Sequence, residues 1–155
     1  MTNTSVAMCL WFDGQAEQAA EFYTSLLPNS KILNVLRPVE GMPAVMVSFT
    51  LDGVSFQALN GGAQFKHSEA ASICVTTQNQ EQTDSLWANL IKDGGSEGQC
   101  AWLKDRFGVS WQIVPSVLPV LLGSNNKEAS ARVMNKMMTM KKIDIAALEK
   151  AFNAK

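Results

Sequence analysis

The stretch Gly53-Val54-Ser55-Phe56-Gln57 recurs later in the chain as Gly108-Val109-Ser110-Trp111-Gln112. Each copy alternates apolar and polar side chains, which is typical of a strand with one buried face. Gln57 and Gln112 therefore fall on the face opposite to the aromatic residue of their copy. We interpret the repeat as a duplicated module, and we expect the two glutamine-bearing faces to line one cavity for a small molecule.

Both copies are surrounded by the same order of predicted elements, which makes duplication a better explanation than a chance match of five letters. In the first copy, Asp13 or Gly14 is expected to cap a helix with apolar residues three and four apart, which Pro28 ends. In the second copy, Asn79 begins the helix and Gly94-Gly95 ends it. The predicted strands are residues 6–12, 31–36, 44–51 and 54–59 in the first copy, and 72–76, 100–104 and 109–114 in the second.

This order predicts an α+β fold of two βαβββ modules, residues 6–62 and 70–115, followed by extra C-terminal helices in residues 116–155. The tail is predicted to form helices at residues 118–122, 127–140 and 143–152. The middle one is rich in methionine, and such a face is typical of a core or a dimer surface.

Composition excludes some classes of partner. The chain has 155 residues, 46% of them hydrophobic, and a formal net charge of −1. A chain of this size can bury a core without a disulfide or a metal, and this charge attracts no phosphate backbone over a distance. The lysines near the C-terminus alternate with methionines as on the wet face of a helix, so we expect no nucleic-acid partner.

The sequence also predicts where the protein resides. No apolar stretch approaches the ~18 residues of a bilayer span, so we expect no membrane partner, and the first residues do not resemble a signal peptide. The cysteines are widely spaced, and we expect Cys9 and Cys74, which lie in apolar runs, to be buried as small hydrophobes. We therefore predict a cytoplasmic, reduced protein.

Several side chains outside the repeat are candidates for binding. Trp102 could stack on a planar ligand with Lys104 on the same face, or belong to the core. His67, the only histidine, is either a solvated loop residue or a general base near the cavity. We also expect Asp105 and Arg106, which lie in a turn, to form a surface pair or a cap. Three tryptophans are expected in the core, namely Trp11, Trp87 and Trp111.

The chain resembles the vicinal oxygen chelate superfamily, which includes glyoxalase I, bleomycin-resistance proteins and extradiol dioxygenases. Within it, the chain is similar to the PhnB-like family, which often carries a demethylubiquinone 3-methyltransferase name. The resemblance rests on residues 12–14, 20–23 and 58–62 and, most specifically, on the stretch from Trp102 to Pro115. It implies one domain of this type over residues 1–155 and, because such modules commonly pair between chains, a homodimer.

The superfamily places metal ligands, typically His, Gln or Glu, on the cavity-facing sides of its strands. Carried over by position, these ligands fall near Met8, Gln57, Ala70 and Gln112. Ala70 cannot ligate, Met8 is a soft ligand, and two neutral glutamines bind divalent ions weakly. A catalytic site normally needs about three good ligands. We therefore expect neither a bound metal nor another cofactor.

These observations favour a metal-free small-molecule-binding protein of the glyoxalase/bleomycin-resistance type, with substrate-binding residues Gln57, Gln112, Trp102, Met8 and His67. The alternatives are a metal-dependent lyase, isomerase or dioxygenase, and an assembly protein that acts through its methionine-rich helices. Whether the protein is an enzyme stays open. Methyltransferase activity is not expected, because the glycine cluster at residues 94–98 follows a helix instead of opening one after a strand.

Overall fold

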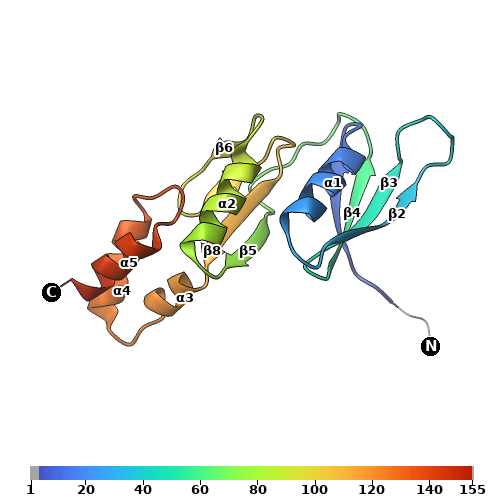
Figure 1. The fold of residues 1–155 in the computed structure, drawn as a ribbon. Helices are drawn as coiled ribbons and strands as arrows, with labels where there is room; N and C mark the ends of the chain where they lie inside the picture. The colour runs from blue at the N-terminus through green and yellow to red at the C-terminus, as the bar shows by residue number, and fades with distance from the viewer. Residues whose placement is uncertain (1–3, 155) are drawn as a thin grey trace. The chain divides into compact units, whose positions relative to one another are not determined.

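The chain divides into two units, residues 1–67 and 68–155, each built around one four-stranded sheet (Figure 1). This computed structural model describes residues 4–154. The strand–helix–strand–strand–strand order occurs in both units, and helices follow it in the second, which confirms the predicted α+β fold of two βαβββ modules. In the described part of the chain, no helix is long and apolar enough to span a bilayer.

Unit 1 packs one helix on one face of its sheet. Its elements are β1 (Met8–Phe12), α1 (Ala16–Leu26), β2 (Lys31–Leu36), β3 (Met46–Leu51) and β4 (Val54–Asn60). The strand order is β1-β4-β3-β2, with β1 parallel to β4 and the other pairs antiparallel. Tyr23 of α1 is buried against Phe49 of β3, and the small residues Ala16, Ala19 and Ala20 let the helix approach the sheet closely.

Asn60 fixes the beginning of α1. Its Oδ1 accepts a hydrogen bond from the backbone N–H of Ala16 at 2.9 Å, and its Nδ2 donates to the carbonyl of Ala44 at 2.8 Å. The expected cap at Asp13 or Gly14 is therefore wrong, because a side chain from β4 satisfies this helix terminus instead.

Unit 2 repeats this arrangement and adds the C-terminal helices. Its elements are β5 (Ile73–Thr77), α2 (Gln80–Ile91), β6 (Ser96–Glu97), β7 (Trp102–Lys104), β8 (Ser110–Pro115), α3 (Val117–Leu122), α4 (Lys127–Met137) and α5 (Ile145–Asn153). The strand order β5-β8-β7-β6 is equivalent to that of unit 1. As predicted, Asn79 caps α2, its Oδ1 accepting from the N–H of Gln82 at 2.9 Å.

The turn between β7 and β8 is built around a buried carboxylate. Asp105 is only 3% exposed, and it accepts hydrogen bonds from the N–H groups of Phe107 and Val109 and from the indole Nε1 of Trp111. Arg106 pairs with Asp93. Of the two roles expected for Asp105, the structure shows the cap of the turn, and it places this carboxylate in the interior instead of on the surface.

The C-terminal helices of unit 2 form a core of their own. Leu118, Val133, Ile143 and Leu148 are buried together with Ala101. The methionines of the segment divide between two environments: Met137 and Met140 pack into this core, whereas Met134 and Met138 are exposed. The methionine-rich segment is thus partly core.

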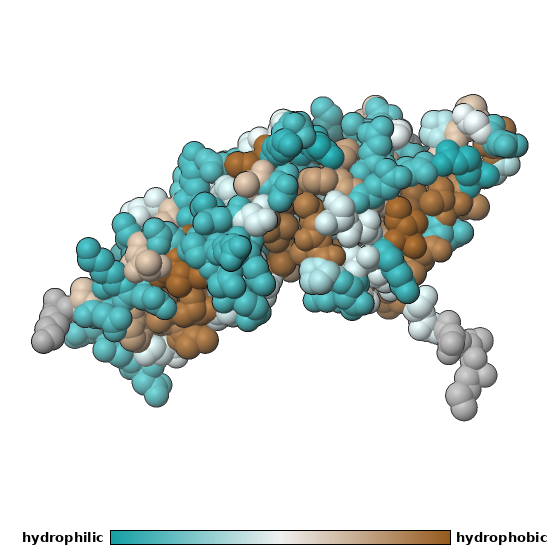
Figure 2. Space-filling model, in the orientation of Figure 1, coloured by the Kyte–Doolittle hydropathy of each residue, from teal (hydrophilic) through white to brown (hydrophobic). Residues whose placement is uncertain are grey.

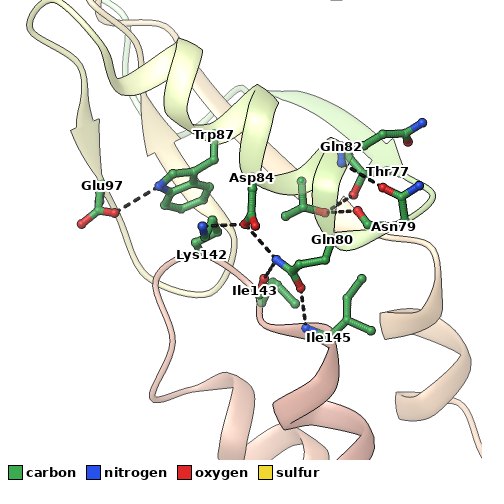
Figure 3. Close-up of polar contacts among 11 residues, drawn as sticks. Thr77, Asn79, Gln80, Gln82, Asp84, Trp87, Glu97, Lys142, Ile143 and Ile145 are labelled. Atoms are coloured by element: carbon green, nitrogen blue, oxygen red, sulfur yellow. Dashed lines mark hydrogen bonds and ion pairs between the residues drawn. The ribbon is translucent and has the colours of Figure 1, made fainter.

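A set of polar contacts holds the segment before α5 against α2 (Figure 3). The side chain of Gln80 donates to the carbonyl of Ile143 at 3.0 Å and accepts from the N–H of Ile145 at 2.8 Å. Lys142 pairs with Asp84, and its hydrogen bond is the main cause that holds the pKa of this carboxyl below its usual value. This C-terminal latch joins the tail to the module before it.

Exposed apolar side chains gather at the free edge of the unit 1 sheet. Figure 2 shows hydrophobic residues, in brown, over the region of β2 and β3. The exposed members at this edge and in the loop that follows it are Leu33, Leu36, Val39, Met42 and Val45. Because β2 has a partner on one side only, both its edge and these side chains are accessible.

Candidate functional site

The repeated glutamines occupy equivalent positions in the two units. β4 and β8 each lie between a parallel strand and an antiparallel strand. Gln57 is paired with Cys9 of β1, and Gln112 is paired with Cys74 of β5. In each unit, the face that carries these residues is turned away from the module's helix, and we call it the glutamine face.

Burial confirms the predicted division of the two faces. Phe56 and Ala58 in β4, and Trp111 and Ile113 in β8, are buried on the helix side. Gln57 and Gln112 are half-buried on the other side. The prediction that both glutamine faces line one cavity stays a prediction.

In unit 1 the glutamine face is mostly neutral. Besides Gln57 and Cys9 it carries Trp11, Ser48 and Leu59, as the strand register shows. Trp11 is half-buried, its Nε1 donates to the carbonyl of Gly62 at 2.8 Å, and Phe65 contacts its ring edge-on at 5.0 Å between centroids. The expected core position of Trp11 is therefore wrong, whereas Trp87 and Trp111 are in the core as predicted.

In unit 2 the glutamine face combines an aromatic ring, an amide, a cation and a hydroxyl. Trp102 of β7 is paired with Gln112, and Lys104 is paired with Ser110. Trp102, Gln112 and Lys104 are half-buried, so that each can reach a ligand. The sequence-based expectation that Trp102 and Lys104 share one face is confirmed, and this face is that of Gln112.

The segment of residues 68–72 lies against this face through two side chains. Glu69 pairs with Lys104, with 2.6 Å between its Oε1 and the lysine Nζ, and Gln112 Nε2 donates to Ser72 Oγ at 2.9 Å. The hydrogen bond from Lys104 is the main cause that lowers the pKa of the Glu69 carboxyl. Both contacts involve residues of the glutamine face and are made by side chains of one short segment.

Ser110 is the polar group of this face that is most deeply buried. It is 1% exposed, and its Oγ is without a hydrogen-bond partner. Buried hydroxyls are normally hydrogen-bonded, and burial without a partner costs free energy. An unpaired hydroxyl beside Lys104 therefore marks a position where a ligand atom would be stabilised.

Two predicted site residues lie elsewhere. Met8 is paired with Phe56 and so belongs to the helix side of the unit 1 sheet, which means that its expected place beside Gln57 is wrong; Cys9 occupies that place. His67 contacts the ring of Phe12, which is buried on the same helix side, at 5.3 Å between centroids. The structure thus brings neither residue to the side chain of Gln57.

Four residues at or against the glutamine faces were not chosen as site residues from the sequence: Cys9, Cys74, Glu69 of the segment of residues 68–72, and Ser110, although strand alternation had already placed Ser110 on the face of Gln112. Cys9 and Cys74 are exposed, which corrects the expectation that they are buried. Their equivalent places could have been found by aligning the first strands of the two modules against the repeated glutamines. Glu69 gave no such signal, because its partner Lys104 is distant in sequence.

The donors on these faces do not fit the divalent metal that the superfamily commonly holds. The strand residues of the two glutamine faces offer amide, hydroxyl, thiol and ammonium groups but no His, Asp or Glu. Within residues 4–154, no cluster of three His, Cys, Asp or Glu side chains has the geometry to hold a metal ion. Hard divalent ions prefer carboxylate or imidazole ligands, which these faces lack.

The fold has counterparts in known proteins. The family model described as 3-demethylubiquinone-9 3-methyltransferase matches residues 4–114, which leaves α3, α4 and α5 outside the match. No curated protein matches the chain.

Solved structures agree with this family match. A Bacillus cereus protein described by the same methyltransferase name, and as PhnB protein, is 29% identical, with a TM-score of 0.67 over 73% of this chain and 100% of that chain. A Pseudomonas aeruginosa protein is 17% identical, with a TM-score of 0.60 over 73% and 98% of the two chains. A fosfomycin resistance protein from Listeria monocytogenes is 11% identical, with a TM-score of 0.52 over 74% and 94%. The last two show a shared fold alone.

Proposed function

The chain belongs to the 3-demethylubiquinone-9 3-methyltransferase family, within the vicinal oxygen chelate superfamily, and from this premise we propose that it is a small-molecule-binding protein that needs no metal. The observation that carries the proposal is the equivalent placement of Gln57 and Gln112, each half-buried on the sheet face opposite the module's helix. A glutamine amide offers both a donor and an acceptor, which suits a polar organic ligand.

The methyltransferase name of the family is not carried over to this chain as an activity. A cofactor-binding methyltransferase of the common type needs a glycine-rich turn between a strand and the helix that follows it. Here Gly94 and Gly95 come after α2 and before β6, where they end a helix. The proposal is therefore binding, with ligand recognition by the glutamine faces.

Ligand-dependent thermal unfolding tests the proposal. A library of small polar molecules is screened against the full chain, because a ligand that binds only the folded state raises the melting temperature as its concentration rises. Hits should stabilise the wild type and the control Gln18→Leu, whose glutamine lies exposed on α1. The same hits should lose their effect in Gln57→Leu or Gln112→Leu. If no compound stabilises the protein, or if hits persist in both variants, the proposal is wrong.

Elemental analysis separates this proposal from a metal-dependent lyase, isomerase or dioxygenase. The chain is purified without chelator, and Mn, Fe, Ni and Zn are measured per protein molecule. We expect less than about a tenth of an equivalent of each, because the faces lack carboxylate and imidazole donors. A full equivalent of one ion, lost on substitution of Gln57 or Gln112, would contradict the proposal.

We further propose that the protein forms a homodimer. The exposed apolar side chains along β2 and in the loop after it, together with exposed Met134 and Met138, support this proposal. Apolar patches of this kind often mark association surfaces. Light scattering at micromolar concentration tests the proposal, and a monomer mass would refute it.

A further inference from the structure

We propose that the ligand of unit 2 carries a carboxylate, which binds Lys104 and Ser110 in the place that the carboxylate of Glu69 partly occupies. This inference rests on the proposed function, since it names the ligand class of the same glutamine face. Three observations carry it: the Glu69–Lys104 pair, the unpaired hydroxyl of Ser110, and the aromatic ring of Trp102 beside Gln112.

Glu69 has the properties of an internal substitute for a ligand. Its side chain is 65% exposed, whereas that of Lys104 is 38% exposed. Ion pairs between exposed side chains contribute little to stability, so an incoming carboxylate can replace Glu69 at small cost. The Glu69 carboxylate shows that the geometry of this face accepts such a group at Lys104.

Ser110 gives the site a second donor that Glu69 leaves unused. Ser110 and Lys104 are paired residues of β8 and β7 and lie on the same face of the sheet. The hydroxyl is 1% exposed and unpaired, although Glu69 is bound to its neighbour. A free carboxylate has two oxygens, so one can accept from the Lys104 ammonium while the other accepts from the Ser110 hydroxyl. Glu69, tethered to its own backbone, satisfies the first contact and not the second.

Trp102 and Gln112 define the remainder of the ligand. Both are half-buried and lie directly side by side on the face, two residues along their strands from Lys104 and Ser110. An indole favours stacking with a planar group, and Gln112 already donates to Ser72 of the same segment as Glu69. We therefore infer a planar carboxylate whose binding displaces the side chains of Glu69 and Ser72 together.

Benzoate and its neutral analogue benzamide test the inference. Their dissociation constants for the full chain are measured by ligand-observed NMR at constant ionic strength. Removing the internal carboxylate in Glu69→Gln should tighten benzoate binding by about two- to fivefold, because an exposed ion pair of this kind closes the site to a ligand by no more than about 1 kcal/mol. The same substitution should leave benzamide binding unchanged. The control Asp93→Asn removes an ion pair of similar exposure elsewhere in unit 2 and should change neither. In Lys104→Met the preference for benzoate over benzamide should disappear.

Ser110→Ala distinguishes a ligand-binding hydroxyl from a structural one. Because burial of a hydroxyl without a partner costs free energy, its removal should raise the melting temperature or at least not lower it, and should weaken benzoate binding several-fold. A lower melting temperature with unchanged benzoate binding would assign Ser110 a structural role and overturn the proposed site.

The outcomes also separate this inference from the proposed function. If neutral compounds from the library bind and depend on Gln112, but Glu69→Gln does not affect benzoate, the carboxylate inference fails and the proposed function stands. If neither class of compound binds any variant, both fail. Benzoate binding that survives Lys104→Met would overturn the inference as well.

Discussion

Replacing Asp105 by asparagine should destabilise unit 2 although the two side chains have nearly the same shape. The carboxylate is 3% exposed and accepts three hydrogen bonds: from Phe107 N at 2.8 Å, from Val109 N at 3.0 Å and from Trp111 Nε1 at 2.8 Å. The first two bonds reach one oxygen, and the indole reaches the other. Asparagine has one acceptor oxygen, so either orientation of the amide points an NH₂ group at an N–H donor.

The magnitude follows from the bond that is lost. A buried donor left without an acceptor costs about 1–3 kcal/mol, and a charge-assisted bond is stronger than a neutral one. We therefore expect Asp105→Asn to lower the free energy of unfolding by about 2–3 kcal/mol. The second substitution Trp111→Phe removes the indole N–H, so Asp105→Asn should cost about 1 kcal/mol less in that background, a coupling within the usual range for residues in contact.

Urea unfolding followed by far-UV circular dichroism measures the four proteins of this double-mutant cycle. The transition midpoint should fall in Asp105→Asn without a change in slope, because the surface exposed on unfolding is the same. An equal loss in both backgrounds would show that the indole bond does not carry the effect. A neutral Asp105→Asn would refute the role given to the buried carboxylate.

Three further predictions concern the tail and the two modules. Gln80→Leu removes both hydrogen bonds that the C-terminal latch makes to the backbone, so the free energy of local opening of α5, measured by hydrogen exchange, should fall by about 2 kcal/mol. The control Glu81→Gln, at an exposed neighbouring residue, should not change it. Unchanged protection of α5 in Gln80→Leu would contradict the latch. The pKa of Asp84 is lowered in the folded state mainly by its hydrogen bond with Lys142, so the ionised carboxylate stabilises the fold at neutral pH, and this stabilisation is lost as the pH falls below about 4. In Lys142→Met the urea midpoint should therefore fall less between neutral pH and pH values below about 4 than it does in the wild type. An identical fall in both proteins would disprove the assignment. A Cβ at Gly61 would overlap the ring of Trp11, so Gly61→Ala should destabilise unit 1 by about 1–3 kcal/mol; a thermal melt like that of the wild type would show that the ring can move aside.

Local patterns in the sequence were sufficient to predict most elements of the two modules. Apolar spacing placed α1 and α2, Asn79 was recognised as the cap of α2, and the repeated stretches located β4 and β8. β6 was missed because it has only two residues, and β7 begins two residues late because Cys100 and Ala101 adopt left-handed backbone conformations. Neither feature has a periodic signal.

The sequence alone determined that Gln57 and Gln112 lie on the faces opposite the helices, because alternation along a strand is a local property of the chain. Tertiary structure alone decided which residues surround them. The pairing of Cys9 in place of Met8 with Gln57, the Asn60 contact that begins α1 and the Glu69–Lys104 pair all join residues distant in sequence. Strand register and loop placement set such contacts, and these depend on how the whole sheet pairs and packs.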